Sequence, residues 1–147
     1  MMTRAARIHV VVALTAILVA AACGPASRHE RRVVLVGDER WTVLLAGADG
    51  MRGLADFDGA DGMLFDLDRD TDPGAVRFVM DGVVFPLDIA WFAADGRLVG
   101  TATMDPCSAT PCPVTSAPGP YRWAIEAPAG AFADLGSSDR LDAGSLP

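Results

Sequence analysis

The chain has 147 residues, with twelve Lys plus Arg against nineteen Asp plus Glu and a formal net charge of −7. This length allows one ordinary domain and excludes repeat arrays and two-domain enzymes. The acidic balance excludes a nucleic-acid binder, which needs a basic face to displace counterions from phosphates.

The N-terminal segment has the pattern of an export signal. Residues 10–22 carry no charge and follow Arg4 and Arg7. This apolar run is shorter than the roughly 20 residues needed to span a bilayer. A basic start and a small-residue exit are typical of a secretory signal peptide, so residues 1–22 are predicted to be removed.

The end of this signal resembles the bacterial lipobox, in which a cysteine thiol is diacylglycerylated and the chain is cut just before it. The residues that carry the resemblance are Val19-Ala20-Ala21-Ala22-Cys23-Gly24. Two acyl chains hold a protein stably on a membrane. We therefore expect lipidation at Cys23 and an extracytoplasmic protein anchored to the cell membrane. The alternative is an unmodified cysteine beside a plain signal-peptidase site.

Charge is uneven after the predicted cleavage. Residues 23–32 form a lipidated polar tether that contains Arg28, Arg31 and Arg32, whereas residues 33–147 hold seven Arg against eighteen acidic residues. Basic groups are attracted to an anionic leaflet and acidic surfaces are repelled by it. This pattern would hold the tether at the membrane and the domain away from it, unless the tether is simply a solvated linker.

Short apolar runs and turn dipeptides predict an all-β domain over residues 33–147. Asp-Gly supplies the positive φ of tight turns and occurs at 49–50, 58–59, 61–62, 81–82 and 95–96. The pairs at 81–82 and 95–96 stand between expected strands and predict hairpins. About seven strands at such spacing favour a compact single-domain β-sandwich or flattened barrel. The expected strands cover residues 33–36, 41–46, 62–65, 75–80, 83–93, 97–104 and 121–127, and residues 129–135 are the one expected short helix.

Large apolar side chains distributed over these strands predict one hydrophobic core. The alternative for the tryptophans is an exposed platform for carbohydrate. The expected core residues are Trp41, Phe65, Phe78, Leu87, Ile89, Trp91, Trp123 and Ile125.

An ordered set of short motifs resembles a bacterial family catalogued as domain of unknown function 192. The motifs are Arg52-Gly53-Leu54, Gly62-Met63-Leu64-Phe65, Phe78-x-Met80, Pro86-Leu87-Asp88-Ile89-Ala90, Asp95-Gly96-Arg97-Leu98-Val99 and Glu126-Ala127-Pro128-Ala129-Gly130. The resemblance covers roughly residues 33–142. It implies a compact β-sandwich, often secreted, with no established biochemical activity.

One stretch departs from the family pattern. The family commonly reads Met-Lys-Asn-Thr where this chain has Met80-Asp81-Gly82-Val83. Glycine keeps the ability of asparagine to adopt a left-handed backbone, which indicates a turn at that position. The loss of lysine and threonine puts a polar ligand site there in doubt.

Histidine is absent from the predicted domain, because His9 lies in the signal and His29 in the tether. A Ser-His-Asp triad and a Cys-His dyad need an imidazole, and a typical catalytic zinc site also uses imidazole ligands. The absence of lysine excludes a Schiff base. We therefore predict no catalytic residue, no metal site and no cofactor, and only carboxylate chemistry remains open.

Four residues are candidates for binding: Arg52, Asp61, Asp88 and Glu126. Two of the acids could act as general acid and base if burial separated their pKa values. The structural alternative has Asp61 capping a turn, Asp88 bonding the backbone within a sheet and Glu126 paired with an arginine. Arg52 is expected as the partner of one of the three acids.

The run from Asp66 to Asp72 has the spacing of the first ligands of a calcium loop. The EF-hand pattern then requires glycine where Thr71 stands and glutamate where Arg77 stands, and both are missing. A looser calcium site and a solvated acidic loop both remain open.

With Cys23 lipidated, Cys107 and Cys112 are expected to form a disulfide in an oxidising compartment. Half of the ten prolines fall between Pro106 and Pro120, so the bridge and the prolines would stiffen one long loop. Such a loop either takes part in recognition or simply connects the neighbouring strands and is held in shape by the disulfide.

These observations predict an exported lipoprotein that acts as a non-catalytic binding or accessory module at the cell envelope. We expect a monomer that meets the membrane through its lipid and takes an unknown small ligand or envelope protein. One alternative is a carboxylate-dependent hydrolase of envelope glycans. Another is a calcium-dependent adhesion module.

Overall fold

The computed structural model describes residues 29–47, 50–52 and 56–144, and this part of the chain contains seven β-strands and no helix. The predicted signal peptide and Cys23 lie outside the described residues. No helix within the described ranges is long and apolar enough to cross a membrane. The strands are β1 (Arg31–Val36), β2 (Glu39–Leu45), β3 (Gly62–Thr71), β4 (Leu87–Phe92), β5 (Leu98–Met104), β6 (Tyr121–Pro128) and β7 (Leu141–Asp142).

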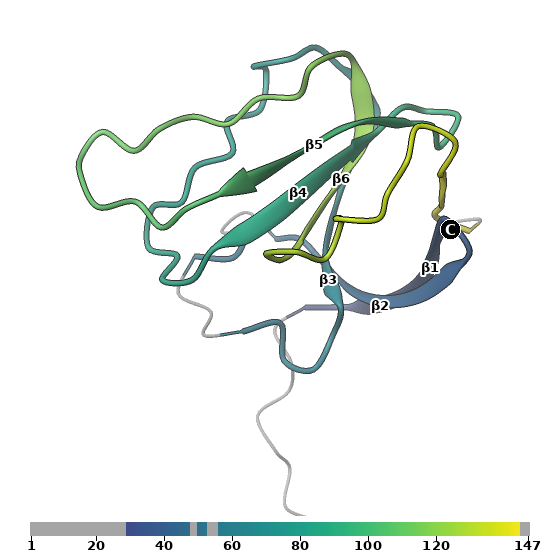
Figure 1. Ribbon diagram of the computed structural model, residues 1–147, viewed down its shortest axis with the longest axis horizontal. Helices are drawn as coiled ribbons and strands as arrows, with labels where there is room; N and C mark the ends of the chain where they lie inside the picture. The colour runs from purple at the N-terminus through teal and green to yellow at the C-terminus, as the bar shows by residue number, and fades with distance from the viewer. Residues whose placement is uncertain (1–28, 48–49, 53–55, 145–147) are drawn as a thin grey trace, which may run out of the picture.

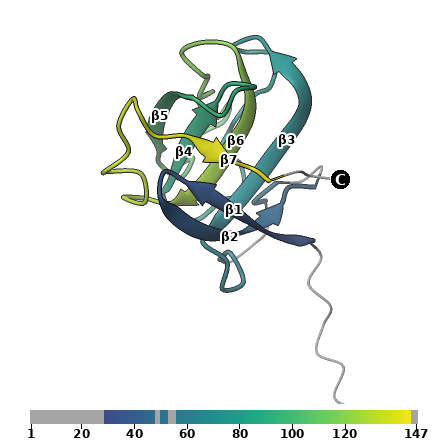
Figure 2. The same cartoon turned by 90° about the vertical axis from the view of Figure 1, so that its right-hand side faces the viewer.

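The seven strands form one curled sheet in the order β5-β4-β6-β3-β2-β1-β7 (Figures 1 and 2). Neighbouring strands are antiparallel except β2 and β3, which are parallel. The two ends of the sheet meet, because Leu141 N donates to Gly96 O (2.8 Å) and Leu98 N donates to Asp139 O (3.3 Å). The all-β prediction is confirmed, and its flattened-barrel form describes this half-closed sheet.

Apolar residues on both faces of the sheet create two cores. The inner core fills the curl and the outer core lies on the opposite face. The inner core contains Val34, Val36, Trp41, Val43, Leu64, Ala90, Phe92, Ile125, Ala127, Phe132, Leu141 and Ala143. The outer core contains Leu44, Met51, Phe57, Met63, Phe78, Met80, Val83, Leu87, Ile89, Trp91, Met104, Ala117, Tyr121 and Ala124. Strand β4 contributes to both cores, which explains its nearly continuous apolar sequence.

Long connections cover the outer core. Members of this core come from residues 46–61 (Met51, Phe57), from residues 72–86 (Phe78, Met80) and from residues 105–120 (Ala117). A sheet face that is apolar must be covered by another layer to exclude water. Here irregular segments form that layer, and they create the cavity described below.

Residues 75–80 do not form the expected strand, and the hairpin expected at Asp81-Gly82 is wrong. The segment makes only an isolated bridge between Phe78 and Thr115. Strand β4 begins at Leu87, and both of its edges are already paired with β5 and β6. No strand edge is left for residues 75–80, so they cross the outer face instead. The second expected hairpin is present, since Asp95-Gly96 connects β4 to β5.

The expected short helix at 129–135 is also wrong, because residues 129–134 form successive turns. Ala131 N donates to Pro128 O (3.0 Å), and Leu135 N donates to Phe132 O (3.2 Å). Gly130 has a φ of 93°, and this left-handed backbone prevents a helix from continuing through it. The ring of Phe132 stacks on that of Trp41, with the ring centres 5.3 Å apart. This segment therefore packs inside the curled sheet, against the inner core.

Six of the eight expected core residues are buried, and two are half-buried. Phe65 packs against the outer core and Trp123 against the inner core. The guanidinium of Arg122 lies 5.0 Å from the centre of the Trp123 ring. Trp41 and Trp91 are buried in different cores, so the tryptophans do not form a platform for carbohydrate.

Candidate functional site

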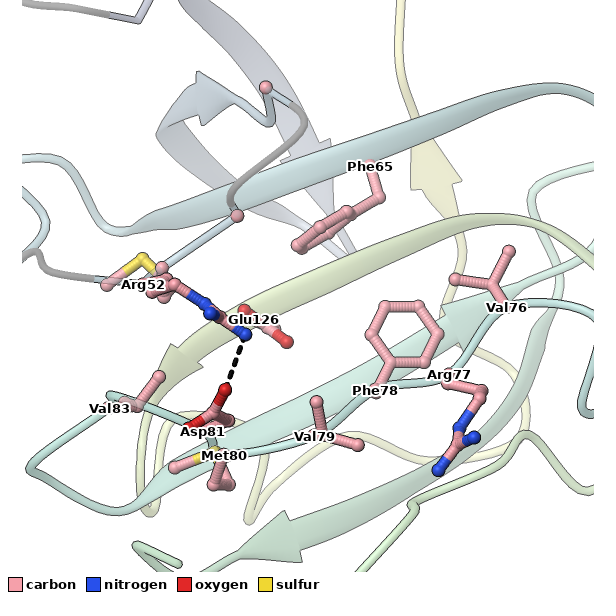
Figure 3. A pocket seen from close by; sticks show the side chains of 13 residues that line it. Arg52, Phe65, Val76, Arg77, Phe78, Val79, Met80, Asp81, Val83 and Glu126 are labelled. Carbon is pink, nitrogen blue, oxygen red and sulfur yellow. Dashed lines mark hydrogen bonds and ion pairs between the residues drawn. The ribbon is translucent and has the colours of Figure 1, made fainter. Parts of the chain in front are cut away.

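A cavity of about 360 Å³ opens on the outer face of β3 and β6, between Gly47 and residues 50–52 on one side and residues 76–83 on the other (Figure 3). The first segment belongs to the crossover between the parallel strands β2 and β3. The second is the stretch that crosses the sheet without joining it. The described residues that line the cavity are Gly47, Gly50, Met51, Arg52, Phe65, Val76, Arg77, Phe78, Val79, Met80, Asp81, Val83 and Glu126.

Glu126 forms the polar floor of this cavity. It lies on β6 opposite Met63 of β3 and Ile89 of β4, at the centre of the sheet. Only 6% of the residue is exposed. In the part of the chain that the structure describes, its carboxylate has no hydrogen-bond or ion-pair partner, so the arginine pairing considered from the sequence is absent there. Burial raises the pKa of Glu126 to about 7.

Several side chains in the wall of the cavity are apolar. Phe65 and Phe78 meet edge to face, with their ring centres 5.5 Å apart. Met51, Met80 and Val83 are buried side chains of the outer core that also line the cavity. A ligand in the cavity would therefore meet aromatic and sulfur-containing side chains as well as Glu126.

An ion pair lies at the mouth of the cavity. Arg52 Nη2 is 2.6 Å from Asp81 Oδ2, and the two side chains are 58% and 56% exposed. This pair joins the two segments that flank the opening (Figure 3). The structure thus pairs Arg52 with Asp81 rather than with one of the three acids considered from the sequence.

Asp61 lies away from the cavity lining and supports the backbone. Its Oδ2 accepts a hydrogen bond from Thr42 N (2.7 Å), and its own N–H donates to Thr42 O (2.7 Å). These bonds hold the start of β3 beside β2. Asp61 thus bonds the backbone of a neighbouring strand, where the alternative from the sequence had it capping a turn.

Asp88 is buried, and both of its carboxylate oxygens are bonded. Oδ1 accepts from Thr103 Oγ1 (2.7 Å) and Oδ2 accepts from Gly130 N (2.8 Å). Asp88 directly precedes Ile89, the residue opposite Glu126, so it points to the other face of the sheet. The structure therefore does not bring Asp61, Asp88 and Glu126 together.

Asp81 and Arg77 line the cavity and were not among the sequence candidates. Asp81 was interpreted as part of a hairpin turn. Gly82 does have a φ of 75°, as the comparison with the family's asparagine indicated. No local pattern in the sequence marks Asp81 as a lining residue, because its place beside Arg52 depends on contacts between distant segments.

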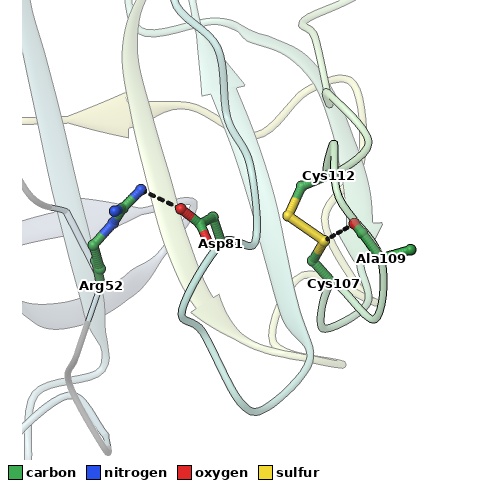
Figure 4. Close-up of a disulfide and its surroundings, with 5 residues drawn as sticks. All are labelled: Arg52, Asp81, Cys107, Ala109 and Cys112. Carbon is green, nitrogen blue, oxygen red and sulfur yellow. Dashed lines mark hydrogen bonds and ion pairs between the residues drawn. A yellow bond between two sulfur atoms is a disulfide. The ribbon is translucent and has the colours of Figure 1, made fainter.

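Cys107 and Cys112 are joined by a disulfide, with Cα atoms 5.5 Å apart (Figure 4). Sγ of Cys107 also lies 2.8 Å from the carbonyl oxygen of Ala109. A few residues further on, Thr115 N donates to Phe78 O (2.9 Å). The stapled loop is thus bonded to the segment that forms one wall of the cavity.

The acidic run from Asp66 to Asp72 does not form a calcium loop. Most of it belongs to β3, whose register with β6 shifts between Asp66 and Thr71. Asp66 Oδ1 is 3.1 Å from Arg122 Nη2. Across the described ranges, no group of three His, Cys, Asp or Glu side chains is arranged to hold a metal ion.

Residues 45–142 match the family model of domain of unknown function 192 (DUF192), described as "Uncharacterized ACR". The chain belongs to the DUF192 family. All described residues that line the cavity fall within this DUF192 segment. The family description assigns no activity to them.

Two crystal structures share the DUF192 chain's fold. A protein of Sinorhizobium meliloti 1021, provisionally named a transcription regulator, is 21% identical, with a TM-score of 0.64 over 78% of this chain and 94% of its own. A protein of unknown function from Novosphingobium aromaticivorans DSM 12444 is 23% identical, with a TM-score of 0.64 over 81% and 89%. No curated protein sequence matches the chain. At these identities the structural likeness shows the fold alone.

Proposed function

We propose that this DUF192 protein is an exported lipoprotein whose β-domain is a non-catalytic binding module for a small ligand. The ligand site is the cavity over Glu126. Its volume of about 360 Å³ is in the range of small-molecule sites, which combine apolar walls with a few placed polar groups.

The observation that carries this proposal is the buried Glu126 carboxylate, which has no hydrogen-bond or ion-pair partner within the described ranges. A buried polar group normally has a hydrogen-bond partner, because desolvating it without compensation destabilises the fold. Asp88, the other buried acid, follows this rule with two bonds. Glu126 has no partner among the described residues and faces an open cavity, where a bound ligand would supply one.

The placement at the cell envelope rests on the sequence. The lipobox residues around Cys23 and the uncharged run before them support export and a lipid anchor. The disulfide between Cys107 and Cys112 agrees with an oxidising compartment.

A ligand screen with matched cavity variants tests the proposal. The full chain, in a nonionic detergent, is screened by thermal shift against sugars, cell-wall fragments, small amines and divalent ions. Val79 lines the cavity, whereas nearby Val84 is 78% exposed and is not among the lining residues. We expect a ligand that raises the Tm of the wild type and of Val84→Trp but not of Val79→Trp. The proposal fails if no compound acts or if both variants respond equally.

A second candidate function, hydrolysis of envelope glycans, is favoured by one observation. Asp81 and Glu126 line the same cavity, and burial raises the pKa of Glu126 to about 7, as a general acid requires. Glycosidases hold two carboxyl groups roughly 5–9.5 Å apart across the scissile bond. Release of reducing ends from cell-wall glycan by the wild type, lost in Glu126→Gln, would support this function. The calcium-dependent alternative has no support among the described residues, which contain no group of three His, Cys, Asp or Glu side chains arranged to hold a metal ion.

A further inference from the structure

The charges around the cavity define what its floor can accept. Among the described residues that line it, the charged ones are Arg52, Arg77, Asp81 and Glu126. Arg52 and Asp81 neutralise each other at the mouth. Arg77 is exposed, and Figure 3 shows its guanidinium directed away from Glu126. The Glu126 carboxylate is therefore the unneutralised charge that a ligand meets inside.

We propose that the cavity binds an organic cation, with its ammonium group paired to the Glu126 carboxylate and its apolar body packed against Phe65 and Phe78. This inference rests on the proposed function and names the ligand class. The ammonium supplies a partner that Glu126 lacks in the described part of the chain, and a charged hydrogen bond is stronger than one from a neutral hydroxyl. The aromatic rings accept an apolar body and attract a nearby cation.

The charge of the whole domain favours the same class of ligand. Residues 33–147 carry seven Arg against eighteen acidic residues. Such a field concentrates cations at the surface and repels anions, and it acts before any contact is made. An anionic ligand would meet this field first and the Glu126 carboxylate afterwards.

The pairing has a consequence for pH, because an ammonium binds the ionised carboxylate. Burial raises the pKa of Glu126 to about 7. Ligand binding therefore releases a proton below that pH, and affinity falls by about tenfold for each further pH unit. The charged neighbours are the Arg52–Asp81 pair and Arg77, all at the exposed rim, where solvent screens them. Asp88 faces the opposite side of the sheet.

Three probes of one shape test the inference. The full chain is titrated by calorimetry with phenethylamine, its neutral counterpart 2-phenylethanol and the anion 3-phenylpropanoate. The comparison is made at pH 8 and pH 5.5, where phenethylamine is cationic throughout. We expect phenethylamine to bind at least about tenfold more tightly than the alcohol at pH 8 and to weaken roughly 30-fold at pH 5.5.

Two variants separate the inference from the proposed function. Glu126→Gln keeps the shape of the floor but not its charge, and should bind phenethylamine weakly and equally at both pH values. Asp70→Asn removes an exposed charge that is not among the lining residues and should bind like the wild type.

Equal affinity for the amine and the alcohol, or tighter binding of the anion, would overturn the cation inference while leaving a small-ligand site intact. Amine binding that survives unchanged in Glu126→Gln would overturn it as well. If no probe binds and the wider screen also finds no ligand, the proposed function fails together with the inference.

Discussion

Glu126 couples the stability of the fold to pH in a direction opposite to that of most acids. Burial raises its pKa from 4.5 to about 7, so the folded state holds this proton more tightly than the unfolded state. Between these two values the folded protein binds more protons, and the free energy of unfolding falls as pH rises. The full loss is at most about 3 kcal/mol, since one pKa unit corresponds to about 1.4 kcal/mol.

Glu126→Gln should therefore be more stable than the wild type at pH 8, by up to about 3 kcal/mol, and the difference should close as the pH falls toward 4.5. Urea unfolding of both proteins between pH 4.5 and pH 8 measures this difference in the free energy of unfolding. Asp70→Asn serves as the control for the loss of an exposed acid. A difference that is constant with pH would show that Glu126 titrates normally in the folded protein.

Both the backbone conformation at position 96 and the atoms around it require glycine there. Its φ is 81°, and a Cβ there would meet the carbonyl of Leu141, where the two ends of the sheet join. Gly74 has a similar φ of 84°, but no atom lies within 4 Å of its Cβ position. Substitution of the two glycines therefore distinguishes the destabilisation caused by backbone strain from that caused by steric conflict.

We expect Gly74→Ala to lower the free energy of unfolding by about 1–2 kcal/mol, the cost of a left-handed alanine. Gly96→Ala should lose about 1–3 kcal/mol more, because Leu141 must move. Chemical denaturation of both variants provides the comparison. Equal losses would mean that the contact between the sheet ends tolerates a methyl group.

The stapled loop between β5 and β6 supports the cavity wall through Phe78. The disulfide closes a short loop, and the bridge from Thr115 to Phe78 follows it. In the chain-entropy treatment a bridge of this span contributes about 2 kcal/mol. Its loss should loosen the segment 76–83 as well as lower overall stability.

The double variant Cys107→Ser with Cys112→Ser should be less stable than the wild type by about 2 kcal/mol. Hydrogen exchange of the 76–83 segment should also increase. Reducing agent should lower the Tm of the wild type to that of the variant and leave the variant unchanged. A reducing agent without effect on the wild type would contradict this role for the bridge.

For the protein as a whole, the proposed lipid anchor at Cys23 would determine its location in the cell. In cells that express the full chain, we expect the wild type in the membrane fraction, with a mass that corresponds to acylated Cys23 at its N-terminus. Cys23→Ser should lose the acyl mass and the membrane association. The Cys107→Ser, Cys112→Ser variant is the matched control and should stay with the membrane. Recovery of wild type with residues 1–22 attached would refute export by this route.

Local patterns determined the class of the fold and most of its strands. Period-two alternation places β6, and Asp95-Gly96 places the turn between β4 and β5, because both depend on neighbours in the sequence. The same reasoning failed at residues 75–80 and 129–135. In the first case β4 had no free edge, and in the second Gly130 has a left-handed backbone while Phe132 packs on Trp41.

The candidate site was decided by tertiary structure. Glu126 and Asp88 lie in family motifs and Asp61 directly precedes one, but their roles differ because strand register sends each to different surroundings. Glu126 faces the cavity, Asp88 the opposite face and Asp61 the backbone of Thr42. Asp81 meets Arg52 across 29 positions of the chain. Composition and local pattern determine charge and strand content, and they predict an export signal. Which carboxylate is left without a partner depends on contacts between distant segments, and only the folded chain makes them.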